Sequence, residues 1–174
     1  IEPNVGVVAV PDARLVRLTE LFNPKKVMPA MVRFVDIAGL VKGAATGEGL
    51  GNKFLAHIRE VDAVIMMVRL FKDPDVVHTM GSVDPKRDVE VIETELILAD
   101  LASLEKQHEK VFGKAKSGDK VAREVLLVLE KLKKGLEAGV PARQQGFDLK
   151  DIRDFFLLTA KPVLYVGNTD ETPD

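Results

Sequence analysis

An aspartate at the end of an apolar run, with a glycine three residues later, forms the motif in this chain best suited to phosphate chemistry. The run Val32–Val35 ends in Asp36, and Gly39 follows. A hard cation such as Mg²⁺ prefers oxygen ligands, and a phosphate oxygen accepts a hydrogen bond from an unobstructed glycine N–H. We therefore expect Asp36 to hold Mg²⁺ through water and Gly39 to contact a γ-phosphate.

The segment after this motif is rich in glycine, at positions 43, 47, 49 and 51. A packed helix or strand would not tolerate that density, so the segment predicts a mobile nucleotide switch. The alternative is that Asp36 only forms a turn, because a motif with two fixed positions recurs by chance.

Several segments resemble one known family. They are Ile1-Glu-Pro-Asn, Phe34-Val-Asp-Ile-Ala-Gly-Leu-Val-Lys-Gly-Ala, Gly47-Glu-Gly-Leu-Gly-Asn, Ile58-Arg-Glu, Glu93-Thr-Glu-Leu, Gly118-Asp119 and Lys161-Pro162. Together they resemble the YchF/Obg-like ATPases, which are Obg-related P-loop NTPases of the translation-factor class. The resemblance covers nearly the whole chain. It implies Mg²⁺-dependent ATP hydrolysis and association with the ribosome or ribosomal RNA.

The chain also departs from the family pattern. No G-x-x-x-x-G-K-[ST] phosphate loop occurs in it, and in the family that loop precedes the Ile-Glu-Pro-Asn segment. The C-terminal TGS domain of the family would follow residue 174. We therefore expect an internal piece of a family protein, which alone would bind triphosphate poorly.

A candidate base-reading loop, Asn168-Thr169-Asp170-Glu171, follows the apolar run Val163–Val166. GTPases of this class use Asn-Lys-x-Asp, whose aspartate accepts two hydrogen bonds from guanine. Glu171 in the aspartate position displaces the carboxylate by one methylene, which spoils that fork. Adenine lacks the two guanine donors, so the pattern, which resembles that of the Obg-like ATPases, favours ATP over GTP. A register shift that presents Asp170 would restore guanine binding, and a plain polar loop is the other alternative.

The residue after the switch glycine is Leu40. Ras-like enzymes carry a glutamine there that orients the attacking water, and leucine cannot do so. We therefore assign no catalytic residue and expect slow hydrolysis, or help from the phosphate loop, a partner or a cation such as K⁺. Lys42 and Arg59 are candidate γ-phosphate contacts, although exposed charges without such a role are commoner.

Apolar runs that alternate with helical patterns predict an α/β fold with a mostly parallel sheet flanked by helices, as in a Ras-like P-loop NTPase core. The first strand is expected to run antiparallel to the second, and Ala63–Val68 to be covered on both faces. The predicted strands are Val5–Val10, Met31–Ile37, Ala63–Val68 and Val163–Val166; the predicted helices are Ala13–Phe22, capped by Asp12, and one after Asn52 that buries Phe54, Leu55 and Ile58.

Residues 88–140 differ from the rest, because they are highly charged and carry heptad repeats. Gly118 and Asp119 can end one helix and cap the next, which predicts an antiparallel coiled-coil hairpin inserted into the core. Residues 1–87 and 141–174 would then form the two parts of the NTPase core. The alternative is two ordinary packed helices. The expected seam is Ile97, Leu101, Leu104, His108, Val111 and Ala115, then Val121, Val125, Val128 and Leu132.

The predicted hairpin tip is basic. Lys110, Lys114, Lys116, Lys120 and Arg123 gather there, interleaved with acidic residues. By sequence alone this is a solvated face. The ribosome association that the resemblance implies favours a partner contact by Lys114, Lys116, Lys120 and Arg123.

Composition limits the remaining possibilities. With 174 residues, 46% of them hydrophobic, the chain can bury one core, and its net charge of −2 provides no overall basic field for nucleic acid. It has no cysteine, no apolar run long enough to cross a membrane, and no histidine cluster with metal-ligand spacing. A cytoplasmic monomer that binds no membrane is expected.

Three functions follow as hypotheses. The first is a ribosome-associated switch that binds and slowly hydrolyses ATP. The second is an Obg-type GTPase, and the third is a ribosome- or RNA-binding module in which hydrolysis is secondary.

Overall fold

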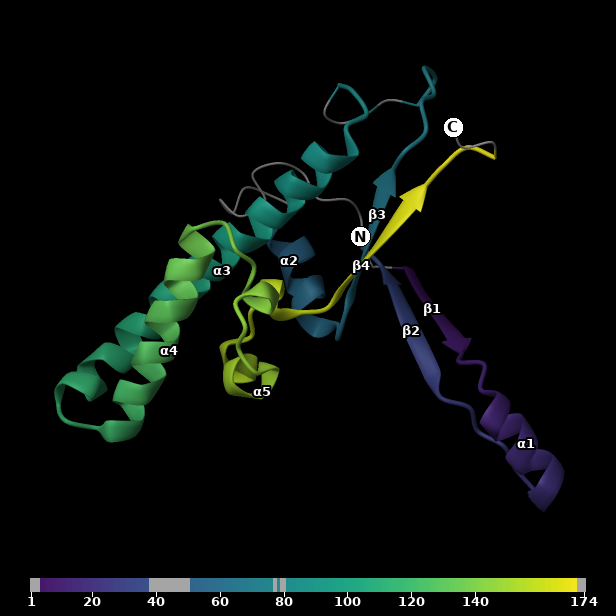
Figure 1. Ribbon diagram of the computed structural model, residues 1–174, viewed down its shortest axis with the longest axis horizontal. Coiled ribbons are helices and arrows are strands. Elements are labelled where there is room, and N and C mark those ends of the chain that lie inside the picture. Colours follow the sequence, from purple (N-terminus) through teal and green to yellow (C-terminus); the bar gives the residue numbers. More distant parts are fainter. Residues whose placement is uncertain (1–3, 38–50, 77, 79–80, 172–174) are drawn as a thin grey trace. The chain divides into compact units, whose positions relative to one another are not determined.

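The computed structural model of the chain describes residues 4–37, 51–76, 78 and 81–171 (Figure 1). The chain forms two compact units, residues 1–39 and 40–174. The division into core, insertion and core that the sequence predicts, at residues 87 and 140, stays a prediction.

The first unit is an antiparallel strand pair connected by a helix. Strands β1 (Asn4–Ala9) and β2 (Met31–Asp36) pair from Asn4 opposite Asp36 to Ala9 opposite Met31. The connecting helix α1 (Ala13–Phe22) is capped by Asp12, whose carboxylate accepts a hydrogen bond of 2.9 Å from the Arg14 N–H. The predicted antiparallel pair, helix and cap are all confirmed.

The second unit contains a parallel strand pair. Strand β3 (Val64–Arg69) pairs with β4 (Val163–Asn168), in register from Val64 opposite Val163 to Arg69 opposite Asn168. Within the described residues the strands therefore form one antiparallel and one parallel pair. The expected single, mostly parallel sheet is not formed by them, because the two pairs belong to different units.

The helix α2 (Gly51–Glu60) precedes β3 and buries Leu55 and Ile58, as predicted, whereas Phe54 is only half-buried. Only one face of β3 is covered in the described part of the chain. Met66 is 5% exposed, whereas Met67 beside it is 64% exposed. Within the described residues the predicted covering of both faces is therefore not found, since side chains of successive strand residues point to opposite faces and only one face is packed there.

Two long helices form a hairpin, in which α3 (Pro85–Lys116) packs along α4 (Lys120–Glu137) (Figure 1). Gly118 has a positive φ of 103°, which favours glycine, and the Asp119 carboxylate accepts a hydrogen bond of 3.1 Å from the Ala122 N–H. The predicted helical hairpin and its turn are therefore confirmed, and its coiled-coil character stays a prediction. Neither this pair nor any other described helix is long and apolar enough to cross a membrane.

The seam of α4 shares Val125 and Leu132 with the predicted heptads, but Ala122 and Leu129 are buried in it in place of Val121 and Val128. Val121 is 69% exposed, whereas Ala122 is buried. Because each residue turns the helix by about 100°, a shift of one position changes which face meets α3. The observed seam keeps the spacing of alternating three and four residues, and it consists of Ala122, Val125, Leu129, Leu132 and Leu136.

The segment after α4 folds back on the hairpin in short turns: η2 (Ala142–Gln144), α5 (Leu149–Ile152), η3 (Arg153–Phe155) and η4 (Leu158–Ala160). Their buried side chains complete the hairpin core. This core consists of Ile97, Leu104, Leu129, Leu132, Leu136, Ala142, Ile152, Phe155 and Leu157. The hairpin thus shares its hydrophobic core with the chain that leads into β4.

This packing predicts opposite effects of one substitution at two helical glycines. A Cβ at Gly135 would lie 2.3 Å from the Gln145 side chain, which the Val140 carbonyl holds by a hydrogen bond of 2.8 Å. Gly135→Ala should therefore lower the free energy of unfolding by about 1–3 kcal/mol. Gly113→Ala, where a Cβ meets nothing within 4 Å, should raise it by about 1 kcal/mol. Denaturant unfolding measures both, and equal effects would contradict the packing.

Candidate functional site

Asp36 lies at the end of β2, where the sequence predicts a ligand of Mg²⁺. Its side chain is exposed, and its carboxylate makes no hydrogen bond or ion pair with any residue that the structure describes. Both carboxylate oxygens are therefore available to a hydrated cation. The switch residues Gly39 and Leu40, and Lys42 after them, lie outside the described residues.

The predicted base-reading loop begins at the end of β4. Asn168 is the last residue of that strand, and its carbonyl accepts a hydrogen bond of 2.8 Å from the Leu70 N–H. Thr169, Asp170 and Glu171 follow and are exposed. The backbone at the start of the loop is thus fixed by the neighbouring strand, while both carboxylates remain accessible to a ligand.

A glycine allows the two strands to be covered closely at this end. A Cβ at Gly167 would lie 2.5 Å from Leu70 Cδ1, which is closer than real Cβ contacts come. The leucine side chain therefore occupies the space that a larger residue at 167 would need. This contact lies directly before Asn168, the first residue of the candidate base loop.

Arg69, at the end of β3, organises the loop beside the candidate base site. Its guanidinium donates three hydrogen bonds of 3.0–3.1 Å, to the carbonyls of Phe71, Asp73 and Val76. It also lies 4.3 Å from the centre of the Phe71 ring. This role of Arg69 was not predicted, although an arginine directly after the apolar run Ala63–Val68 was the available signal in the sequence.

A buried carboxylate joins the hairpin to the chain that enters β4. Asp100, on α3, is 0% exposed and accepts hydrogen bonds of 2.8 Å from the N–H groups of Leu158 and Thr159 and one of 2.7 Å from the Thr159 hydroxyl. The hydroxyl oxygen of Thr159 in turn accepts a hydrogen bond of 3.1 Å from the Ala142 N–H. Burial raises the pKa of Asp100, and the hydrogen bonds from Thr159 and Leu158 and the charge of Arg59 offset part of that rise.

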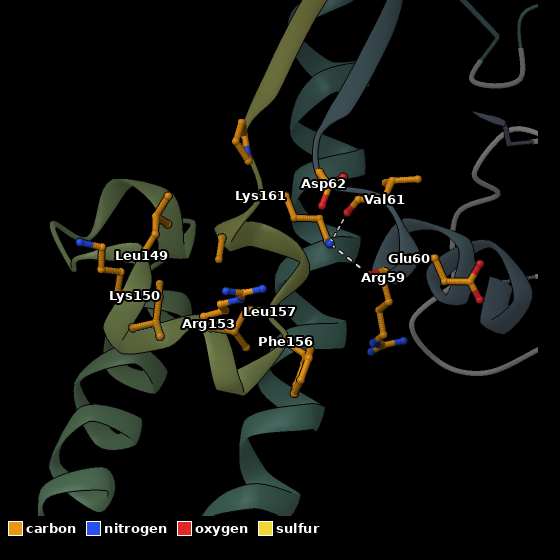
Figure 2. Close-up of a pocket in the computed structure, with 13 residues that line it drawn as sticks. Arg59, Glu60, Val61, Asp62, Leu149, Lys150, Arg153, Phe156, Leu157 and Lys161 are labelled. Atoms are coloured by element: carbon orange, nitrogen blue, oxygen red, sulfur yellow. Dashed lines mark hydrogen bonds between the residues drawn. The ribbon is translucent and has the colours of Figure 1, made fainter. Parts of the chain in front are cut away.

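Two further polar contacts join α2 and β4 to this junction. The Lys161 ammonium donates to the carbonyls of Arg59, at 3.1 Å, and Val61, at 2.5 Å, where α2 ends (Figure 2). Burial lowers the pKa of this lysine. On the other side, Glu93 of α3 binds Arg143 and accepts a hydrogen bond of 2.5 Å from the Tyr165 hydroxyl of β4.

The basic tip of the hairpin is formed as predicted, with one difference among its residues. Lys114, Lys116 and Lys120 are exposed, and their ammonium groups have no hydrogen bond or ion pair in the described part of the chain. Arg123 instead donates a hydrogen bond of 3.2 Å to the Ala115 carbonyl and so helps to close the turn. The three lysines are thus the more available charges. His108, on the seam, is half-buried and stacks on the Phe112 ring, as a structural residue would.

Comparison with known proteins shows which family this chain resembles. Residues 12–94 match the family model described as 50S ribosome-binding GTPase. The chain is 52% identical to the ribosome-binding ATPase YchF of Bacillus subtilis, over 98% of this chain and 48% of that protein. It is 48% identical to the protein of that name from Haemophilus influenzae, with the same coverage. The chain belongs to the YchF family.

A solved structure supports the same fold. The structure of the Schizosaccharomyces pombe YchF GTPase matches with a TM-score of 0.77 and 40% identity, over 98% of this chain and 48% of that one. The chain therefore has the Ras-like GTPase-domain fold of the family. It spans about half the length of the YchF relatives it matches.

Arg69 gives a test of the geometry at this end of the sheet. Arg69→Lys keeps the charge, but one ammonium cannot reach three carbonyls in the directions of a guanidinium. We expect faster amide exchange in residues 71–76 and a loss of about 1–2 kcal/mol in the free energy of unfolding. Arg33→Lys, at an exposed position on β2, is the control and should change stability by less than about 0.5 kcal/mol. Unchanged exchange in residues 71–76 would show that Arg69 does not hold the loop.

Proposed function

We propose that this chain is part of a ribosome-associated switch that binds and slowly hydrolyses ATP, with ATP preferred over GTP. The observation that carries the proposal is the loop Asn168–Glu171, which departs from the guanine-reading pattern and is anchored on β4 by the Leu70 N–H. Relatives that match nearly the whole chain are named ribosome-binding ATPases.

The ATP preference rests on the length of one side chain. Glu171 places its carboxylate one methylene further from the backbone than the aspartate of a guanine site, so it cannot accept both guanine hydrogen bonds from the same position. Thr169 replaces the lysine that would cover the base. Adenine offers neither guanine donor, and ATP therefore loses nothing at this loop.

The proposed metal is Mg²⁺, and Asp36 fits it, because its oxygens are exposed and make no contact within the described residues. A Mg²⁺ ion held there would supply positive charge that offsets the negative charge of the nucleotide phosphates. Asp36 would hold one of its water ligands at the end of β2. A K⁺ ion is a further candidate, since Leu40 cannot position the attacking water.

The base loop gives the direct test of ATP preference. In the longest native chain that contains this segment, Mg²⁺-ATP should bind more tightly than Mg²⁺-GTP. Glu171→Asp should restore the guanine fork and raise GTP affinity about tenfold or more relative to ATP, since two hydrogen bonds to a charged group are recovered. Titration calorimetry with both nucleotides measures the ratio.

An Obg-type GTPase is the second candidate, because Asp170 is exposed in the same loop and the solved S. pombe relative is titled a GTPase. Tighter GTP binding that is lost in Asp170→Asn would establish this function in place of ours. Glu171→Asp would then change little.

The hairpin is the proposed contact with the ribosome. Its two helices would form a coiled coil, and the lysines of its tip would bind phosphates of ribosomal RNA. A protein that works there would act in the cytoplasm, and we propose that it acts as a monomer. A module that only binds the ribosome is the third candidate, favoured by the three lysines of the tip, whose ammonium groups contact no described residue.

Charge reversal separates the tip from the nucleotide site. Lys114→Glu, Lys116→Glu and Lys120→Glu together should weaken co-sedimentation with ribosomes at least tenfold and leave ATP turnover unchanged, because the tip is no part of the nucleotide site. The control carries Lys106→Glu, Lys131→Glu and Lys134→Glu on the exposed sides of the same helices. Equal losses in both variants would mean that overall charge, rather than the tip, determines binding.

A further inference from the structure

A groove of about 390 Å³ lies between the end of α2 and the short turns that precede β4. Figure 2 shows it, with Arg59, Glu60 and Asp62 on one side and Lys150, Arg153 and Phe156 on the other. All of its lining residues belong to the second unit and are described. None of them belongs to the base-reading loop or to the hairpin tip.

Three of the lining side chains are cations without a partner in the described part of the chain. The guanidinium groups of Arg59 and Arg153 and the ammonium of Lys150 make no hydrogen bond or ion pair there, and all three residues are exposed. Lys161, by contrast, is occupied by the carbonyls at the end of α2. The free cations outnumber the two carboxylates of the lining, those of Glu60 and Asp62. The groove can therefore accept an anionic ligand.

Phe156 combines a left-handed backbone conformation with an exposed side chain. Its φ of 53° and ψ of 41° are left-handed, a region that residues other than glycine rarely adopt, and its side chain is 72% exposed. The residues on either side, Phe155 and Leu157, are buried in the hairpin core and fix this backbone. Phe156 therefore joins a strained backbone to a solvent-exposed aromatic ring, in a groove lined also by Arg59 and Arg153, which have no partner among the described residues.

We propose that this groove binds a segment of single-stranded RNA. One base of the RNA stacks on the Phe156 ring, and the RNA phosphates contact the side chains of Arg59, Arg153 and Lys150. Single-stranded nucleic acids bind to surfaces that combine exposed rings with a positive track. An acidic peptide would use the cations but leave the ring without a role. In a double helix the bases are stacked and cannot reach the ring. The inference deepens the proposed ribosome association, on which it rests for the kind of partner.

The test uses the full-length natural protein and a fluorescent eight-nucleotide oligouridine. Phe156→Gly should weaken binding about tenfold or more, since stacking on the ring is lost. The same change should leave the melting temperature unchanged or raise it, because glycine adopts a positive φ freely. Loss of binding without loss of stability is a result that a purely structural role of Phe156 would not give.

The charges provide a second arm with a matched control. Arg153→Glu should weaken oligouridine binding more than Phe156→Gly and reduce its dependence on salt, because a phosphate contact is removed. Lys131→Glu, the same change of charge on the exposed side of α4, should leave the affinity within about twofold. Turnover of Mg²⁺-ATP should be the same in all three variants.

Two results would overturn the inference. Unchanged oligouridine affinity in Phe156→Gly would exclude stacking in the groove. Displacement of the oligouridine by polyglutamate, with affinity equal to that of the RNA, would make an acidic peptide the ligand instead. Co-sedimentation with ribosomes is measured separately on the unmodified protein. If the protein does not co-sediment with ribosomes while oligouridine still binds through Phe156, the proposed ribosome function is wrong and the proposed RNA site in the groove is retained.

Discussion

The buried carboxylate of Asp100 is the contact on which the larger unit depends. It lies inside the helical hairpin and accepts three hydrogen bonds, all from residues 58 or 59 positions later in the chain. An uncompensated carboxylate in such a place would cost several kcal/mol, so the donors and the carboxylate must stay together. If the short turns before β4 separated from the hairpin, the Asp100 carboxylate would therefore lose its hydrogen-bond donors or become exposed to solvent. Burial raises the pKa of Asp100, and its hydrogen bonds from Thr159 and Leu158 act in the opposite direction.

The junction around Asp100 is also connected to α2 and to the candidate base loop after β4, the two elements that matter for nucleotide chemistry. Two residues after Thr159, Lys161 binds the carbonyls at the end of α2, the helix that follows the glycine-rich segment. Beyond it, β4 runs to Asn168 and the candidate base loop. The hairpin, α2 and the base loop are thus connected through residues 158–161. Ala160 and Lys161 of this junction also line the groove beside Phe156, so an RNA ligand there would lie next to the junction.

Local signals in the sequence predicted much of this structure. The caps Asp12 and Asp119 and the positive φ at Gly118 depend only on neighbouring residues, and all were placed correctly. Asp36 and Asn168 lie at strand ends as expected. These features need no knowledge of distant contacts.

The failures have a common physical cause, which is that distant packing decided them. Asp100 reads as an ordinary polar position on a helix, because its donors lie far away in the sequence. The exposure of Val121 depends on which face of α4 meets α3, and the apolar pattern allowed two neighbouring registers. The strain at Phe156 is set by the burial of Phe155 and Leu157 and carries no local signal at all.

Amide hydrogen exchange at Leu158 and Thr159 tests the central claim most directly, in the longest native chain that contains this segment. If Asp100 holds the junction, both amides exchange as slowly as the buried middle of α3. In Asp100→Asn they become fast, while α3 and α4 stay protected. Fast exchange of the two amides in the unmodified protein, or no change on substitution, would contradict the account.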